Sequence, residues 1–226
     1  GLRVVPLAVD DEGVRPDALR TAMRSGVRAL VCSPRAQNPY GGCFSTARRD
    51  ALVEVLREEP DVLVVENDHA SVVADAPLRT LTSGGLPRWV HVRTVSKFLG
   101  TDLRWAAAAC DATTLSRHDG RLLLTSGWVS HLLQETVYGL LTDDGTRALV
   151  SRARETYALR RAALLEELAA RGVRAHGTSG MNVWVPARDE SAVVNGLRSY
   201  GWWVAAGARF RLASEPAVRI TVADLD

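Results

Sequence analysis

The pattern of apolar and polar residues predicts an α/β fold with a mostly parallel sheet. Near-continuous apolar runs alternate with helical patterns in the first part of the chain, as they do when crossover helices connect parallel strands. Strands that are covered on both faces are expected to be continuously apolar rather than alternating. The predicted strands are residues 29–33, 62–66, 90–95 and 105–110.

Three helices are predicted between and after these strands. The first follows Ser45, a suitable N-cap, and runs to about Glu58. Its buried side is expected to carry Leu52, Val53 and Leu56. The other two helices are predicted over residues 129–141 and, rich in arginine, over residues 146–171.

After Gly172, a residue that suits the end of a helix, the apolar runs become shorter. This change predicts a second, smaller C-terminal α+β domain. We therefore expect residues 1–150 to belong to the large domain, and residues 151–226 to form a connecting helix and the small domain. The small domain is predicted to have a helix at residues 191–200 and strands at residues 173–176, 181–185, 202–205 and 218–222.

The composition is that of an ordinary globular protein. Hydrophobic residues make up 46% and charged residues 24% of the chain, and the formal net charge is +2. The arginines are spread along the chain, which does not indicate nucleic-acid binding by this segment. No apolar run is long enough to predict a membrane span. Three cysteines without paired metal-ligand spacing favour a reducing cytoplasm and no metal site.

Lys97 is the only lysine among the 28 lysine and arginine residues. Arginine replaces lysine in most surface roles, but its delocalised guanidinium does not form an imine with an aldehyde. A lysine amine does so once its surroundings make it available. Biased codon usage explains the count equally well, so the neighbouring residues must decide between the two interpretations.

Polar residues gather in four clusters, each at a predicted strand end, where open α/β sheets bind ligands. In the third cluster, Thr94 and Ser96 precede Lys97, and Arg104 follows. Hydroxyl groups with a nearby arginine suit a phosphate, and a lysine beside a phosphate site indicates pyridoxal 5′-phosphate (PLP) held as an imine. Considered without the other clusters, these residues are also compatible with an ordinary strand end that carries a solvated lysine. The clusters are residues 33–41, 64–69, 94–104 and 217–221.

In this order, the clusters resemble those of the fold-type I PLP enzymes, the aspartate aminotransferase superfamily. That superfamily has Asn-Pro-x-Gly, an acidic strand end, Ser-x-Ser-Lys with a downstream arginine, and a C-terminal arginine. The resemblance covers essentially the whole chain and is closest to the MocR-type regulators of the GntR family. These fuse a winged helix-turn-helix to an aminotransferase-like domain. Residues 34–39, 127–134 and 208–211 look like that subgroup.

The resemblance implies a role for each matching residue. Lys97 matches the lysine that forms the internal aldimine, and Asn38 matches the asparagine that hydrogen-bonds the ring oxygen of the cofactor. Arg219 matches the arginine that binds the carboxylate of an amino-acid ligand. The phosphate-binding positions are matched by Thr94, Ser96 and Arg104.

The chain departs from the family pattern in several places. Asn67 matches the aspartate that keeps the ring nitrogen protonated, unless a shift by one residue gives this role to Asp68. His69 stands where the family has a tyrosine near the ring oxygen. Arg35 is either functional or a solvated loop residue. The N-terminal part of the family's large domain has no counterpart in this sequence, and neither has the DNA-binding domain. We therefore expect that the sequence is a fragment or that the remainder of the protein was not included in this chain.

The leading hypothesis is a PLP-binding effector and dimerisation domain of a bacterial regulator that senses an amino acid, an amine or PLP itself. DNA contact is expected only through a domain outside this chain. The alternative is an active aminotransferase acting on an amino acid, and a third possibility is a scaffold without cofactor. Asn67 and residues 127–134 favour the regulator. We also expect a cytoplasmic homodimer, with Trp128 and Trp202–Trp203 as candidate packing surfaces.

Overall fold

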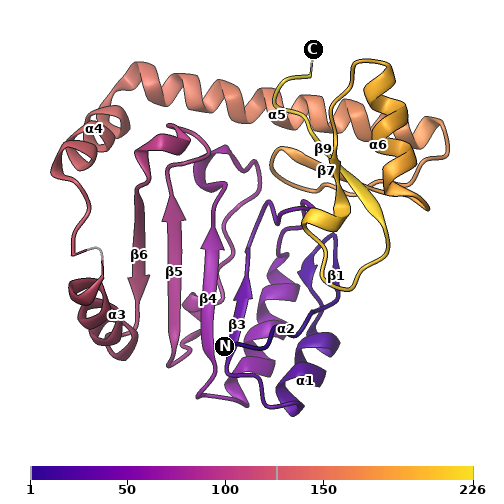
Figure 1. The fold of residues 1–226 in the computed structure, drawn as a ribbon. Coiled ribbons are helices and arrows are strands. Elements are labelled where there is room, and N and C mark those ends of the chain that lie inside the picture. The colour runs from indigo at the N-terminus through magenta and orange to yellow at the C-terminus, as the bar shows by residue number, and fades with distance from the viewer. Residues whose placement is uncertain (1, 126, 226) are drawn as a thin grey trace.

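A four-stranded sheet in the order β3-β4-β5-β6 is the centre of the larger part of the molecule (Figure 1). The computed structural model describes residues 2–125 and 127–225. β3 (Ala29–Cys32), β4 (Leu63–Asp68) and β5 (Trp89–Thr94) are parallel and lie close to their predicted positions. The predicted α/β class with a mostly parallel sheet is therefore confirmed.

β6 (Ala106–Cys110) is antiparallel to β5, although the sequence pattern predicted a further parallel strand. The segment that joins them, residues 95–105, contains only the short helix η3 (Thr101–Leu103). A parallel return needs about a dozen residues or more, usually including an α-helix. The connection is therefore too short for a parallel crossover, and this part of the prediction is wrong.

α1 (Pro16–Arg24) and α2 (Thr46–Arg57) pack together against β3 and β4. As predicted, Ser45 caps α2, because its side chain accepts a hydrogen bond from the backbone nitrogen of Arg48 at 3.0 Å. α1 was not predicted. The core between these elements includes Leu19, Leu30, Leu52, Leu56, Val64 and Leu81.

The side of β3 that faces away from this core is open in the described residues. Val31 is 70% exposed, and Ala29 on the same side is exposed as well. Side chains alternate between the two faces of a strand, so the helices on one side leave the other side uncovered. The expectation that these strands are covered on both faces is therefore wrong for β3.

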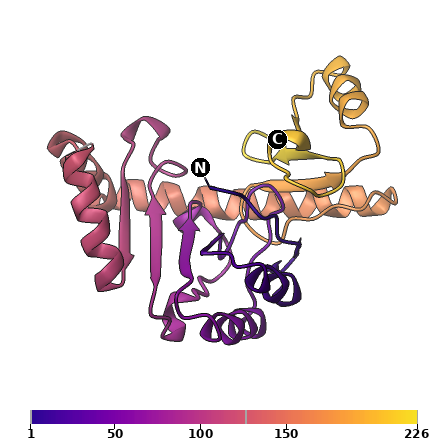
Figure 2. The same cartoon turned by 60° about the horizontal axis from the view of Figure 1, so that its bottom comes forward.

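Three helices follow the sheet: α3 (Ala112–Leu124), α4 (His131–Thr142) and α5 (Asp144–Ala170). α3 was not predicted, whereas α4 and α5 lie close to the predicted ranges. Figures 1 and 2 show α5 extending from the side of β6 and α4 to the small sheet. Among the described helices, none combines the length and the apolar composition that a membrane span requires.

The C-terminal part is a three-stranded antiparallel sheet in the order β7-β9-β8, with one helix beside it. Val183, Val185 and Val218 of this sheet form a buried core with leucines of α5. The elements are β7 (Asn182–Pro186), α6 (Glu190–Ser199), β8 (Ala205–Ala206) and β9 (Ala217–Thr221).

Two predicted strands of this part are wrong or displaced, because their first residues end helices instead. The backbone nitrogen of Val173 donates to the carbonyl of Leu168 and so closes α5, and only His176 of residues 173–176 forms a bridge. Trp202 likewise donates to Leu197 at the end of α6, so the predicted strand 202–205 is reduced to β8.

The remaining elements are short and lie in the connections. β1 and β2 form an antiparallel hairpin near the N-terminus, and the described residues include four 3-10 helices in loops. Their bounds, besides η3, are β1 (Val9–Asp10), β2 (Gly13–Val14), η1 (Ser71–Val73), η2 (Thr82–Gly84) and η4 (Gly207–Arg209).

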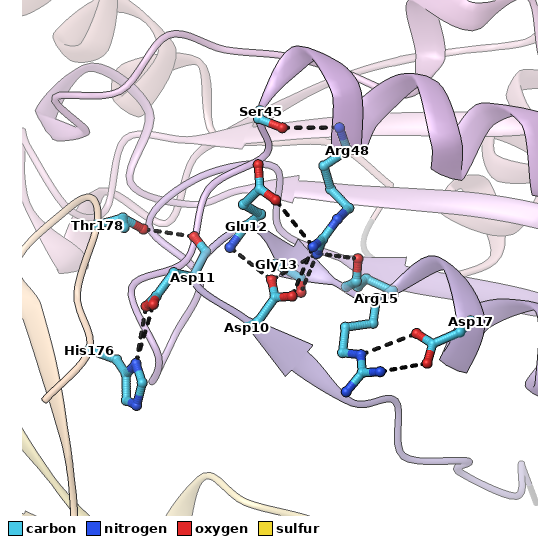
Figure 3. Close-up of polar contacts among 11 residues, drawn as sticks. Asp10, Asp11, Glu12, Gly13, Arg15, Asp17, Ser45, Arg48, His176 and Thr178 are labelled. Atoms are coloured by element: carbon cyan, nitrogen blue, oxygen red, sulfur yellow. Dashed lines mark hydrogen bonds and ion pairs between the residues drawn. The ribbon is translucent and has the colours of Figure 1, made fainter. Parts of the chain in front are cut away.

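The β1–β2 hairpin connects the two parts of the molecule (Figure 3). On one side, Arg48 of α2 binds both carboxylate oxygens of Asp10 at 2.8 Å. On the other side, Nδ1 of His176 lies 3.1 Å from Oδ1 of Asp11, and the hydroxyl of Thr178 donates to the carbonyl of Asp11 at 2.9 Å. These contacts hold the loop before β7 against the large part.

Candidate functional site

The C-terminal ends of β3, β4 and β5 lie at one edge of the sheet, because the three strands are parallel. Two of the predicted polar clusters follow β3 and β5, a third lies within and at the end of β4, and the fourth lies on β9. A cleft between these loops and the small sheet brings together Asn38, His69, Lys97 and Arg219. Its other lining residues are Ala36, Ala70, Met181, Asn182 and Thr221.

Arg219 reaches the cleft from β9. Its Nη1 donates to Oδ1 of Asn38 at 2.8 Å, and its Cζ lies 4.1 Å from the ring centroid of Phe210. Its Nε is buried and has no hydrogen-bond partner among the described residues. Burial lowers the pKa of Arg219, and the positive charge of Arg209 lowers it further. An unpaired donor on a planar cationic fork is suited to binding a carboxylate.

His69 and Lys97 line the same cleft from the ends of β4 and β5. Burial lowers the pKa of His69 from 6.5, and the charge of Lys97 adds to this effect. The imidazole is therefore neutral at pH 7 and has one donor and one acceptor nitrogen. It can hydrogen-bond a ligand oxygen without adding a second positive charge beside Lys97.

Asn67 and Asp68 face opposite sides of β4, because successive side chains of a strand alternate. Asp68 is fully buried, whereas Asn67 is exposed. The Asp68 carboxylate receives two hydrogen bonds from Arg35, each of 2.9 Å. Arg35 itself is only 8% exposed, so its interpretation as a solvated loop residue is wrong.

The three predicted phosphate-binding residues do not line the cleft. The hydroxyls of Thr94 and Ser96 lie 2.9 Å apart, and the Thr94 hydroxyl donates to the carbonyl of Trp105 at 3.1 Å. Arg104 is exposed and has a left-handed backbone with φ 45° and ψ 35°. All three lie at or after the C-terminal end of β5, and their phosphate-binding role remains a prediction.

Comparison with curated proteins gives a regulator and an aminotransferase. The chain is 36% identical over its whole length to the vitamin B6 salvage pathway transcriptional repressor PtsJ of Salmonella typhimurium, and it spans 53% of that protein. Over 127 residues, 48% of this chain and 25% of the relative, it is 32% identical to the aminotransferase swnA of Metarhizium robertsii. The chain thus spans about half the length, or less, of these relatives. No protein-family model matches it.

Several solved structures with the same arrangement are aminotransferases. LysN of Thermus thermophilus, an α-aminoadipate aminotransferase in complex with N-(5′-phosphopyridoxyl)-L-leucine, superposes with a TM-score of 0.86 at 24% identity over 99% of this chain and 61% of LysN. The kynurenine aminotransferase of Pyrococcus horikoshii gives 0.85 at 21% identity over 98% of this chain and 59% of the enzyme. The chain has the fold-type I aminotransferase fold. The predicted fold class and the predicted resemblance are therefore confirmed.

Two polar residues of the cleft in this aminotransferase fold were not singled out from the sequence. The hydroxyl of Thr221 donates to Oδ1 of Asn182 at 3.1 Å. Thr221 lies two residues after Arg219 on β9, so the strand period of two places both side chains on one face. That signal was present in the sequence. Asn182 becomes recognisable only through the pairing of β7 with β9, in which it lies opposite Thr221.

Proposed function

We propose that this chain is the PLP-binding, aminotransferase-like effector-binding and dimerisation domain of a GntR/MocR-type transcriptional regulator. The observation that carries the proposal is the cleft that joins Lys97 to Asn38, His69 and Arg219. The 36% identity to PtsJ, a transcriptional repressor named for vitamin B6 salvage, supports a regulator. In this proposal, DNA is bound by a domain outside this chain, and the regulator is a homodimer.

The residues of the site fit this cofactor. When bound, PLP supplies an aldehyde that condenses with amines and a ring that withdraws electrons. Lys97 provides the only lysine amine of the chain, and its Nζ would hold the aldehyde of the cofactor. Oδ1 of Asn38 already accepts from Arg219, so the Asn38 amide nitrogen is left to donate to the ring oxygen, beside neutral His69. Thr94, Ser96 and Arg104 are assigned to the phosphate.

An amino compound is the proposed effector, and Arg219 is assigned to its carboxylate. Nη1 of Arg219 is committed to Asn38, so Nε and Nη2 remain on one edge of the guanidinium. That edge matches the two oxygens of a carboxylate. An amine held near Lys97 with its carboxylate on Arg219 would span the cleft from the large part to the small sheet.

The first test concerns Lys97 in the complete protein. After incubation with PLP and reduction with borohydride, peptide mapping should place the pyridoxyl adduct on Lys97. Lys97→Arg keeps the charge but cannot form an imine, so it should lose the visible absorbance band. A Lys97→Arg protein that retains this band contradicts the proposal.

The alternative is a catalytically active aminotransferase acting on an amino acid, which the fold and the likeness to swnA favour. Asn67 argues against it, because an amide lacks the charge that holds a ring nitrogen protonated. A lost electrostatic contact of this kind costs about 3 kcal/mol in a barrier, on the order of a hundredfold in rate. Stopped-flow spectra should therefore show fast binding of an amino acid and little pyridoxamine product. Fast and complete formation of pyridoxamine phosphate would support the aminotransferase instead.

A further inference from the structure

Asn182 and Thr221 line the same cleft as Lys97 and Arg219, on the side of the small sheet. They lie opposite each other in the pairing of β7 with β9, and the Thr221 hydroxyl donates to Oδ1 of Asn182 at 3.1 Å. This bond orients the amide, because its oxygen is committed to the hydroxyl. The amide nitrogen has no hydrogen-bond partner among the described residues, so its two N–H groups are left for a ligand.

The other donors of the cleft already have a role in the proposed function. Lys97 is assigned to the aldehyde of the cofactor, and Asn38 and His69 to its ring oxygen. Arg219 is assigned to the carboxylate of the effector. Among the polar side chains that line the cleft, the Asn182 amide is therefore the donor for which neither the cofactor nor the carboxylate supplies a partner.

The Asn182 amide lies close enough to Arg219 for one small ligand to contact both. Arg219 and Thr221 are two residues apart on one face of β9, which separates their positions by roughly 7 Å. Asn182 lies beside Thr221 on the neighbouring strand. A ligand whose carboxylate binds Arg219 can therefore extend a short side chain to this amide.

The chemistry of that side chain follows from the free N–H groups. An apolar side chain would cover them without offering an acceptor, and a donor that is removed from water without a partner costs free energy. An oxygen on the side chain would accept from the amide and avoid this cost. The remaining lining residues, Ala36, Ala70 and Met181, offer no side-chain donor to replace it.

We infer that Asn182 is a specificity-determining residue, which selects amino acids with a short, oxygen-bearing side chain over apolar ones of similar size. Thr221 is a positioning residue, because it holds the amide with its N–H groups free. The inference rests on the proposed function, since it concerns the effector of the same cleft.

The test compares the Kd of L-serine with that of L-alanine, which lacks only the hydroxyl, through the visible absorbance of PLP bound to the complete protein. The wild type should prefer L-serine by about threefold to tenfold, the net contribution of one hydrogen bond. Asn182→Leu has a similar size without a polar group and should bring this ratio close to one. Thr221→Val should reduce the ratio, whereas Thr221→Ser keeps the hydroxyl and should retain it.

The ratio separates specificity from a general loss of stability, because both ligands bind to the same variant. Asn195→Leu is the matched control, since it makes the same substitution at an exposed position of α6 and should keep the wild-type ratio. An equal affinity for both ligands in the wild type, or an unchanged ratio in Asn182→Leu, would overturn the inference alone.

If Asn182→Leu does not fold, the two Thr221 variants decide, and equal ratios in Thr221→Val and Thr221→Ser would overturn the inference. A wild-type protein that shows no visible PLP band would overturn the proposed function together with the inference.

Discussion

Replacing Arg219 by lysine should remove the preference of the site for a ligand that carries a carboxylate. Arg219 donates to Asn38 through Nη1, and its buried Nε has no partner among the described residues. A carboxylate would satisfy this donor and accept from Nη2 as well. Lysine keeps the positive charge but lacks the planar fork, and it also loses the stacking on Phe210.

The size of the effect follows from these contacts. A hydrogen bond to a charged group contributes about 1.5–3 kcal/mol. A cation–π contact such as that between Arg219 and Phe210 adds about 0.5–1 kcal/mol. A lysine at position 219 would keep one of the two charged hydrogen bonds to the carboxylate. It would lose the other hydrogen bond and the stacking on Phe210. We therefore expect a loss of about 2–4 kcal/mol, on the order of a hundredfold in Kd.

The assay compares L-alanine with ethylamine, which has the same amine but no carboxylate, and follows the visible absorbance of bound PLP. The wild type should bind L-alanine more tightly, and Arg219→Lys should lose most of this difference. Arg209→Lys is the matched control, because it keeps the neighbouring charge and leaves the fork of Arg219 intact. Equal preference for L-alanine in the wild type and in Arg219→Lys would refute the assignment of the carboxylate to Arg219.

Three further predictions concern stability, protonation and assembly. Asp75→Ala leaves the buried guanidinium of Arg161 unpaired and should lower the free energy of unfolding in urea by about 3 kcal/mol. Burial alone would raise the pKa of Asp75, but its bonds to Arg161 and to the backbone nitrogen of Gly180 together outweigh this and lower the pKa below 3.8. The stabilisation by Asp75 is therefore present above that pH and disappears as acid titrates the folded state. The NMR titration of His69 should have its midpoint below 6.5, and Lys97→Ala should raise it, because a repelling charge is removed. Sedimentation of the complete protein should give a homodimer, with Trp128, 75% exposed in this chain, as a candidate contact; a PLP-loaded monomer at every concentration would contradict this.

Local sequence patterns were sufficient to predict the parallel strands β3, β4 and β5 and the helices α2, α4 and α5. Continuous apolar runs and helical periodicity are properties of short segments, and N-caps such as Ser45 act within one turn. The sequence also singled out the candidates for chemistry, because a unique lysine and ordered motifs are visible without coordinates. Four of these candidates, Asn38, His69, Lys97 and Arg219, do share one cleft.

The pairing of these residues, in contrast, became visible only in three dimensions. Asn38 and Arg219 are separated by 181 residues and Arg35 and Asp68 by 33, and no local pattern encodes such partners. Strand alternation places Asn67 and Asp68 on opposite faces of β4, and the tertiary packing against one of these faces then decided that Asp68 is buried and Asn67 exposed.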